Sequence, residues 1–165
     1  GRRHFLHTGQ EWRRQSIHNR MEGGEMRILV LDDEPWSVSW IRDFVKPLGG
    51  EVELVETFDQ AVSACKNGVP DIAVIDVMIG QSSVPFQGAT LANAEEQWQG
   101  LKFLRHLRVE LRASKKTTEI IVYSVLDRGD LADLVVRAYQ GHFRTKGDVS
   151  QFRKLLGSLL REKTS

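Results

Sequence analysis

The chain has 165 residues, of which 41% are hydrophobic and 27% charged, so it is long and apolar enough for one globular domain with a sizeable core. Its formal net charge of +1 does not support a nucleic-acid or membrane surface, and its longest apolar runs are far shorter than the roughly 20 residues of a membrane span. The single cysteine, Cys65, excludes an internal disulfide and a cysteine-based metal cluster, which favours a reducing cytoplasm.

Residues 1–25 differ in composition from the rest of the chain. They are polar, rich in arginine and without a regular apolar pattern, and no apolar segment follows their basic residues as a secretory signal would require. We interpret them as a leader, a linker or a tag-derived extension. Without a folded scaffold, their arginines are not expected to bind nucleic acid. The predicted domain therefore covers residues 26–165.

From residue 26 the sequence alternates predicted strands and helices. The strands are short apolar runs rich in branched residues, and the helices repeat apolar residues every three or four positions. Pro35 suits a first helical turn, Gly49 and Gly50 suit a helix end, and Thr57 suits a helix cap. In chain order the first elements are strand 27–31, helix 36–48, strand 52–55, helix 58–66 and strand 72–79.

A polar stretch over residues 80–100 interrupts this alternation. The elements that follow it are helix 101–111, strand 119–125, helix 130–139, strand 141–146 and helix 149–160. Strands that are apolar on both faces and joined by helices predict an α/β fold, with a doubly wound parallel sheet covered on both sides. In such a sheet the ligand site lies outside the carboxyl ends of the strands.

Residues suited to chemistry stand at or near these strand ends. Asp32 and Asp33 end the first strand, and Asp76 lies two-thirds of the way along the third. The fourth strand leads to Ser124 and the fifth to Lys146. Three carboxylates about 4 Å apart repel one another by roughly 1 kcal/mol per pair in water, and by more in a partly dry cleft. A hard divalent cation relieves this repulsion, and oxygen ligands of this kind suit Mg²⁺.

The same group of side chains suits phosphoryl transfer. A carboxylate held by a metal ion and a lysine is a competent phosphoryl acceptor, because both cations stabilise charge on the transferring group. The hydroxyl of Ser124 can hydrogen-bond the phosphoryl group afterwards. The sequence therefore predicts a metal-assisted phosphoacceptor site at one edge of the sheet.

The order Asp-Asp, Asp, Ser and Lys at successive strand ends resembles the receiver domain of two-component response regulators. The resemblance covers about residues 26–163, and the separations of the acidic residues and of Ser124 from Lys146 agree with it. It implies a flavodoxin-like fold, in which five parallel strands have the order 2-1-3-4-5 and helices cover both faces.

The resemblance also implies the phosphoacceptor and the metal ligands. Asp76 is the expected phosphoacceptor and a metal ligand. Asp33 is expected to bind Mg²⁺ directly, and Asp32 mainly through water. Met78 is expected to supply a backbone carbonyl oxygen to the metal, for which Mn²⁺ is an alternative.

Three further residues would form the switch. Ser124 is the expected hydroxyl that moves to the phosphoryl group, and Lys146 is the expected ion-pair partner of that group. Phe143 is the expected aromatic residue that turns inward as Ser124 moves. This movement would alter the surface of the last helices.

The implied protein is a signalling phosphoacceptor, not an enzyme that turns over a small substrate. Its expected partners are a histidine kinase or phosphotransfer protein and a downstream protein effector. A homodimer through the fourth helix, fifth strand and fifth helix is also suggested. No direct nucleic-acid or membrane partner is expected, and the predicted location is cytoplasmic. No effector sequence follows the last predicted helix, so the chain is either a stand-alone receiver or part of a longer protein.

Several residues depart from the family pattern. Gly100 matches a glycine that the family has about eight residues after the phosphoacceptor, so about 16 residues are inserted here, at about 80–95. We interpret the insertion as a tolerated surface loop, with a lid or a partner contact as alternatives. Val125 replaces a small residue and is bulky enough to crowd the phosphoryl group, and Gly147 replaces the proline that usually follows the lysine.

Two apolar residues bear on the lifetime of the phosphorylated form. Met78 and Leu126 occupy positions where polar side chains in the family help to orient an attacking water. We therefore expect a long-lived phosphorylated form.

Two other functions fit parts of the sequence. A pseudo-receiver would have the same fold but act as a phosphorylation-independent interaction module. This alternative is favoured by Val125, the missing proline and the insertion. It is opposed by the intact set of acidic residues, serine hydroxyl and lysine. A Mg²⁺-dependent phosphohydrolase of the haloacid-dehalogenase type also uses a strand-end aspartate. That class has a D-x-D motif, whereas Asp32 and Asp33 are adjacent in this chain.

Overall fold

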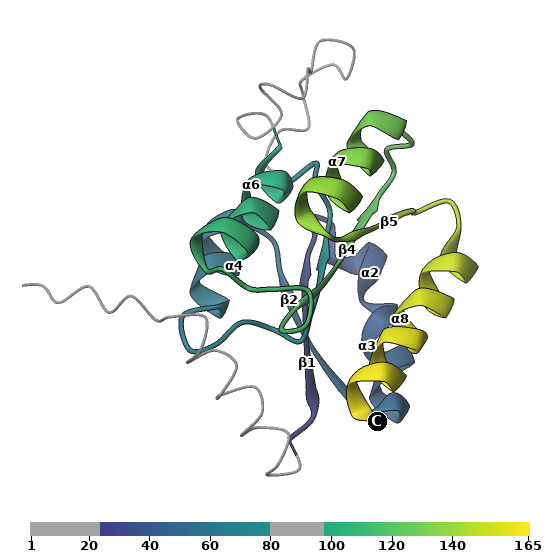
Figure 1. Cartoon of the computed structure of the whole chain (residues 1–165). Helices are drawn as coiled ribbons and strands as arrows, with labels where there is room; N and C mark the ends of the chain where they lie inside the picture. The colour runs from purple at the N-terminus through teal and green to yellow at the C-terminus, as the bar shows by residue number, and fades with distance from the viewer. Residues whose placement is uncertain (1–23, 80–97) are drawn as a thin grey trace, which may run out of the picture.

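A computed structural model of the chain describes residues 24–79 and 98–165 (Figure 1). The expected extension, residues 1–25, lies outside the described residues except for its last two. The expected insertion at about 80–95 lies outside them entirely. Neither of these two predictions is therefore tested by the structure.

Five parallel strands form a single sheet in the order β2-β1-β3-β4-β5, as predicted. The strands are β1 (Met26–Leu31), β2 (Gly50–Val55), β3 (Ile72–Ile75), β4 (Glu119–Ser124) and β5 (His142–Thr145). Parallel pairing places all the carboxyl ends along one edge, because every strand runs in the same direction. The polar residues that follow the strands are therefore gathered at that edge.

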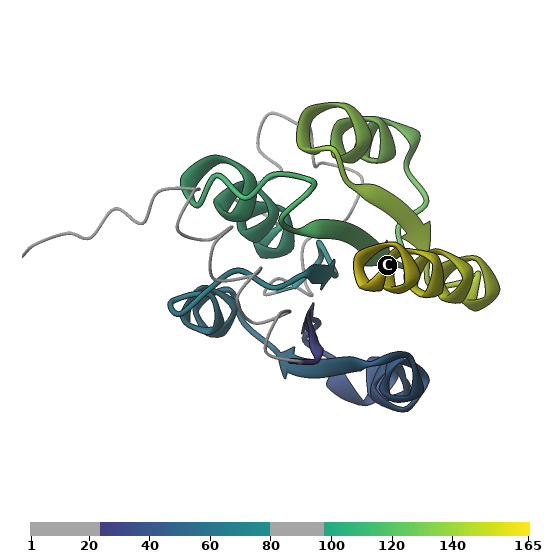
Figure 2. The same cartoon turned by 60° about the horizontal axis from the view of Figure 1, so that its bottom comes forward.

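The helices cover both faces of the sheet (Figures 1 and 2). They are α2 (Pro35–Val38), α3 (Trp40–Val45), the 3₁₀ turn η1 (Lys46–Leu48), α4 (Phe58–Ala64), α6 (Gln99–Arg105), the π-helical turn η3 (His106–Glu110), α7 (Gly129–Tyr139) and α8 (Val149–Thr164). Helices α4, α6 and α7 pack on one face, and α3 and α8 pack on the other. Among the described residues, no helix combines the length and the apolar character needed to cross a membrane.

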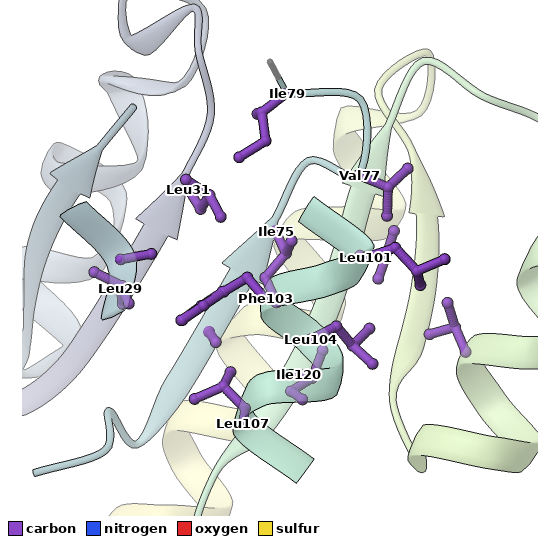
Figure 3. Close-up of a cluster of buried hydrophobic side chains, with 14 of the residues drawn as sticks. Leu29, Leu31, Ile75, Val77, Ile79, Leu101, Phe103, Leu104, Leu107 and Ile120 are labelled. Carbon is purple, nitrogen blue, oxygen red and sulfur yellow. The ribbon is translucent and has the colours of Figure 1, made fainter. Parts of the chain in front are cut away.

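The two-sided core follows from the alternation of side chains along each strand. In β1, Leu29 and Leu31 belong to the apolar cluster beneath α4, α6 and α7, whereas Ile28 and Val30 belong to the cluster beneath α3 and α8. Figure 3 shows part of the first cluster, where side chains of α6 and η3 lie against β1, β3 and β4. Cys65 is buried in the same cluster, and burial raises the pKa of its thiol to about 12.

Several predicted elements are shorter or more broken in the structure. The third strand ends at Ile75, not at residue 79, so Asp76 follows the strand instead of lying within it. The predicted helix 36–48 is divided into α2, α3 and η1, and Gly49 ends the last of these with a positive φ of 82°. The predicted helix 101–111 changes at residue 106 from α6 into the turn η3.

The turn η3 carries a half-buried arginine that joins it to two other segments. The guanidinium group of Arg108 donates hydrogen bonds to the carbonyl oxygens of Tyr139 at 2.7 Å, Ala113 at 3.0 Å and Thr118 at 2.7 Å. These carbonyls belong to the end of α7 and to the segment before β4. Burial lowers the pKa of Arg108 to about 10. Arg108 therefore fixes the carboxyl end of α7 to the sheet.

Gly100 permits a close approach of α6 to the backbone of Asp76 and Val77. Its backbone N–H donates to the carbonyl oxygen of Val77 at 3.2 Å. A Cβ atom at position 100 would lie 2.0 Å from the carbonyl oxygen of Asp76 and 2.5 Å from the Cα of Val77. Such distances are too short for a side chain, so only glycine fits here without moving the backbone that carries Asp76.

We expect Gly100→Ala to lower the free energy of unfolding by about 1–3 kcal/mol, because the new methyl group collides with backbone instead of a movable side chain. Chemical denaturation checks this. Gly129→Ala is the control, since a Cβ atom there would have nothing within 4 Å. Equal denaturation midpoints for Gly100→Ala and the unaltered chain would contradict the packing described.

Candidate functional site

The acidic pair lies directly after β1. The backbone N–H of Asp32 donates to the carbonyl oxygen of Val55 at 3.0 Å, which continues the pairing of β1 with β2. The Asp32 carboxylate is buried, and its Oδ1 accepts a hydrogen bond from the backbone N–H of Glu34 at 2.9 Å. Asp33 is exposed to solvent. The pair thus offers one fixed carboxylate and one that faces water.

Asp76 is brought beside the pair by the pairing of β1 with β3. Its backbone N–H donates to the carbonyl oxygen of Leu31 at 2.8 Å. The side chain is buried, and its Oδ1 accepts from the backbone N–H of Met78 at 3.0 Å. Carboxylate oxygens of Asp32, Asp33 and Asp76 lie within 4.8 Å of one another. The structure therefore brings the three predicted acidic residues together.

Lys146 reaches the acidic group from the segment after β5. Its backbone N–H donates to the carbonyl oxygen of Ser124 at 2.8 Å. Its Nζ lies 2.6 Å from Oδ2 of Asp32 and 3.2 Å from Oδ2 of Asp76. The lysine thus bridges the first and third acidic residues in the group.

The charges of the site shift one another's protonation. Burial raises the pKa of Asp76, and the Lys146 ammonium and the Met78 N–H offset part of that rise. Partial burial, followed by the charges of Asp32 and Glu34, also raises the pKa of Asp33. Burial alone would lower the pKa of Lys146, but Asp76 and Asp32 outweigh it, so the pKa is raised. The ammonium group of Lys146 therefore does not balance the negative charge of the three carboxylates.

The two predicted switch residues lie on β4 and β5. Ser124 is fully buried at the end of β4, and its Oγ accepts a hydrogen bond from the backbone N–H of Leu126 at 3.3 Å. Phe143 is half-buried on β5, opposite Val122, and packs against the core beneath α4, α6 and α7. In this structure the serine hydroxyl is thus bonded to the loop that follows it.

The residues that depart from the family pattern have clear positions. Val125 is 67% exposed, so its side chain lies largely in solvent. Leu126 is buried, and Met78 is half-buried against the core. Gly147 is exposed with open space around it, and the described residues have no cis peptide bond.

The donor set fits a hard divalent cation. Three carboxylates close together match the oxygen ligands that Mg²⁺ prefers, and they carry more negative charge than Lys146 neutralises. Asp32 and Asp76 already accept hydrogen bonds from protein donors, whereas Asp33 faces solvent. Asp33 is therefore the carboxylate best placed to bind an incoming ion directly.

The backbone N–H groups of Glu34 and Met78 were missed by sequence reasoning. Each donates to an aspartate two residues earlier in the chain. An aspartate at a strand end that precedes a turn commonly accepts such a bond, so the local sequence did contain a signal. For Met78 the resemblance to receiver domains implied a role for the carbonyl oxygen, and the structure shows a hydrogen bond from the amide.

Comparison with known proteins supports the fold. No family model and no curated protein matches the sequence. Among solved structures, a receiver domain of a Francisella response regulator has a TM-score of 0.62 with 18% identity, covering 85% of this chain and 99% of its own.

Two further structures agree with this result. A two-component response regulator from Clostridium difficile has a TM-score of 0.64 with 11% identity, covering 86% of this chain and 100% of its own. The response regulator TrrA from Thermotoga maritima, in complex with Mg²⁺ and BeF, has a TM-score of 0.55 with 19% identity, covering 81% of this chain and 98% of its own. The chain therefore has the fold of response-regulator receiver domains.

Proposed function

We propose that the protein is a phosphoaccepting receiver, in which Asp76 takes a phosphoryl group from a histidine kinase or a phosphotransfer protein. The observation that carries this proposal is the contact of one ammonium group, that of Lys146, with both Asp32 and Asp76. A lysine ammonium that contacts two carboxylates can stabilise the negative charge of a phosphoryl group as that group is transferred to one of them. The receiver fold supports the same function.

In the proposed reaction an oxygen of Asp76 attacks the phosphorus atom of a phosphohistidine. The phosphorus–nitrogen bond breaks, the imidazole leaves, and an acyl phosphate remains on Asp76. Lys146 stabilises the negative charge of the transferring group, and the Met78 N–H holds the carboxylate in position. The side chain of Val125 lies in solvent, which supports access of the phosphoryl group.

Mg²⁺, or Mn²⁺ in its place, would be held by Asp33, by Asp32 mainly through water, by Asp76 and by the backbone carbonyl of Met78. When bound, it would supply positive charge to the phosphoryl oxygens. The grouping of three carboxylates supports this assignment.

The proposed output is a protein contact. Ser124 would move towards the phosphoryl group, Phe143 would turn inward, and the surface around α7, β5 and α8 would change. A downstream protein effector would bind that surface, which also suits a homodimer because Val136 on α7 is 52% exposed. We propose that this signalling takes place in the cytoplasm and that the protein does not act as an enzyme on a small substrate.

Beryllofluoride, a mimic of the phosphoryl group, tests the proposal. In the presence of Mg²⁺ we expect it to change the tryptophan fluorescence of the protein, and a small phosphodonor to add the mass of one phosphoryl group. Asp76→Asn should abolish both responses, because the accepting oxygen is lost. Glu56→Gln is the control, since Glu56 is exposed and outside the acidic group. Absence of both responses would contradict the proposal and favour the pseudo-receiver.

Thermal unfolding tests the charge balance. Because the pKa of Asp76 is raised in the folded state, the folded protein loses stability as the pH rises and the carboxyl ionises. Without metal, Asp76→Asn should therefore raise the unfolding temperature at neutral pH, and this gain should disappear in acid. Mg²⁺ at 100 times its dissociation constant should stabilise the unaltered chain by about 2.7 kcal/mol and the variant less. Equal stabilisation of both proteins by Mg²⁺ would count against the assigned ligands.

The lifetime of the acyl phosphate tests the role of the apolar neighbours. Met78 and Leu126 carry no group that could orient water, so we expect slow loss of phosphate from the purified protein with Mg²⁺. Met78→Asn should accelerate the loss severalfold, as followed by mass spectrometry. Rapid loss from the unaltered chain would refute this expectation.

A further inference from the structure

A cation–π contact joins two loops that flank the site. The guanidinium carbon of Arg128 lies 5.6 Å from the centre of the Trp98 ring. Trp98 is buried and directly precedes α6, whereas Arg128 directly precedes α7. One partner therefore belongs to the connection after β3 and the other to the connection after β4.

Trp98 is fixed to the backbone that carries Asp76. Its carbonyl oxygen accepts from the N–H of Leu101 at 3.1 Å, which starts the first turn of α6. In that turn Gly100 donates to the carbonyl oxygen of Val77 at 3.2 Å and packs directly on the carbonyl of Asp76. The backbone of Trp98 is thus joined through the first turn of α6 to the segment that carries Asp76.

Arg128 is connected to Ser124 through a short loop. The Ser124 hydroxyl accepts from the N–H of Leu126 at 3.3 Å, and residues 125–127 join Ser124 to Arg128. Arg128 follows this loop, and its Nε donates to Oδ1 of Asp130 at 2.9 Å, which orients the guanidinium group. Arg128 thus holds the far end of the short loop whose backbone bonds to the Ser124 hydroxyl.

We infer that the Trp98–Arg128 contact is a latch that holds the loop of residues 125–128 in its unphosphorylated position. This inference rests on the proposed function. The latch opposes the movement of Ser124, so it lowers the affinity of the site for a phosphoryl group and sets how readily the protein switches. A cation–π contact of this kind corresponds to an effect of about two- to tenfold on that affinity.

The direction of the effect distinguishes a latch from simple electrostatics. Arg128 carries a positive charge, so its removal would weaken the binding of an anion if charge alone mattered. Loss of a latch has the opposite result, because the loop then moves at lower cost. Loss of a positive charge cannot tighten the binding of an anion. Tighter binding of beryllofluoride after removal of Arg128 would therefore be evidence for the latch.

The test is a calorimetric titration of the full chain with beryllofluoride in excess Mg²⁺. Arg128→Gln should bind about two- to tenfold more tightly than the unaltered chain. Trp98→Phe keeps a buried ring with weaker attraction for a cation, so its gain should be smaller and should vanish when Arg128→Gln is also present. Such non-additivity shows that the two residues act through one contact.

The matched control is Arg153→Gln. Arg153 lies 5.0 Å from the Trp40 ring centre, so it makes the same kind of contact between α8 and α3 on the other face of the sheet. Its affinity should equal that of the unaltered chain. Unchanged or weaker binding by Arg128→Gln overturns the latch alone. Failure of the unaltered chain to bind beryllofluoride overturns both the latch and the proposed function.

Discussion

The ammonium group of Lys146 lies between two buried carboxylates, and the geometry of the site depends on this interaction. Asp32 and Asp76 have little access to water, and each unpaired buried ion costs several kcal/mol. Lys146 supplies the counter-charge, and the raised pKa of its ammonium keeps it charged while it does so. The remaining excess of negative charge is what gives the edge of the sheet its suitability for a divalent cation.

The sheet, more than the loops, places these three side chains. The backbone N–H groups of Asp32, Asp76 and Lys146 each bond to a carbonyl oxygen of a neighbouring strand or of the segment that follows it. Each of these three residues is thus the first residue beyond its own strand, and its N–H still takes part in the hydrogen-bond ladder of the sheet. A site built in this way can keep its geometry while the loops around it vary, which agrees with a receiver fold at identities below 20%.

Local patterns in the sequence were sufficient for the alternation of strands and helices, for the parallel sheet and for the acidic group at the strand ends. The strand order came from the resemblance to receiver domains. The sequence was not sufficient where a side chain forms a turn at the end of a strand, or where long-range contacts decide. Asp76 lies beyond the end of β3 because its Oδ1 bonds to Met78 in a turn, although the apolar residues around it predicted a continuous strand. The hydrogen bonds of Arg108 and the contact of Trp98 with Arg128 join segments far apart in the chain, which no local pattern reveals.

We propose above all that Asp76 accepts a phosphoryl group beside Lys146. The most direct measurement is borohydride reduction after treatment with a small phosphodonor and Mg²⁺, which converts a phosphorylated aspartate to homoserine that peptide mass spectrometry can locate. We expect homoserine at position 76, dependent on Mg²⁺. Homoserine at another aspartate, or none at any position, would contradict it.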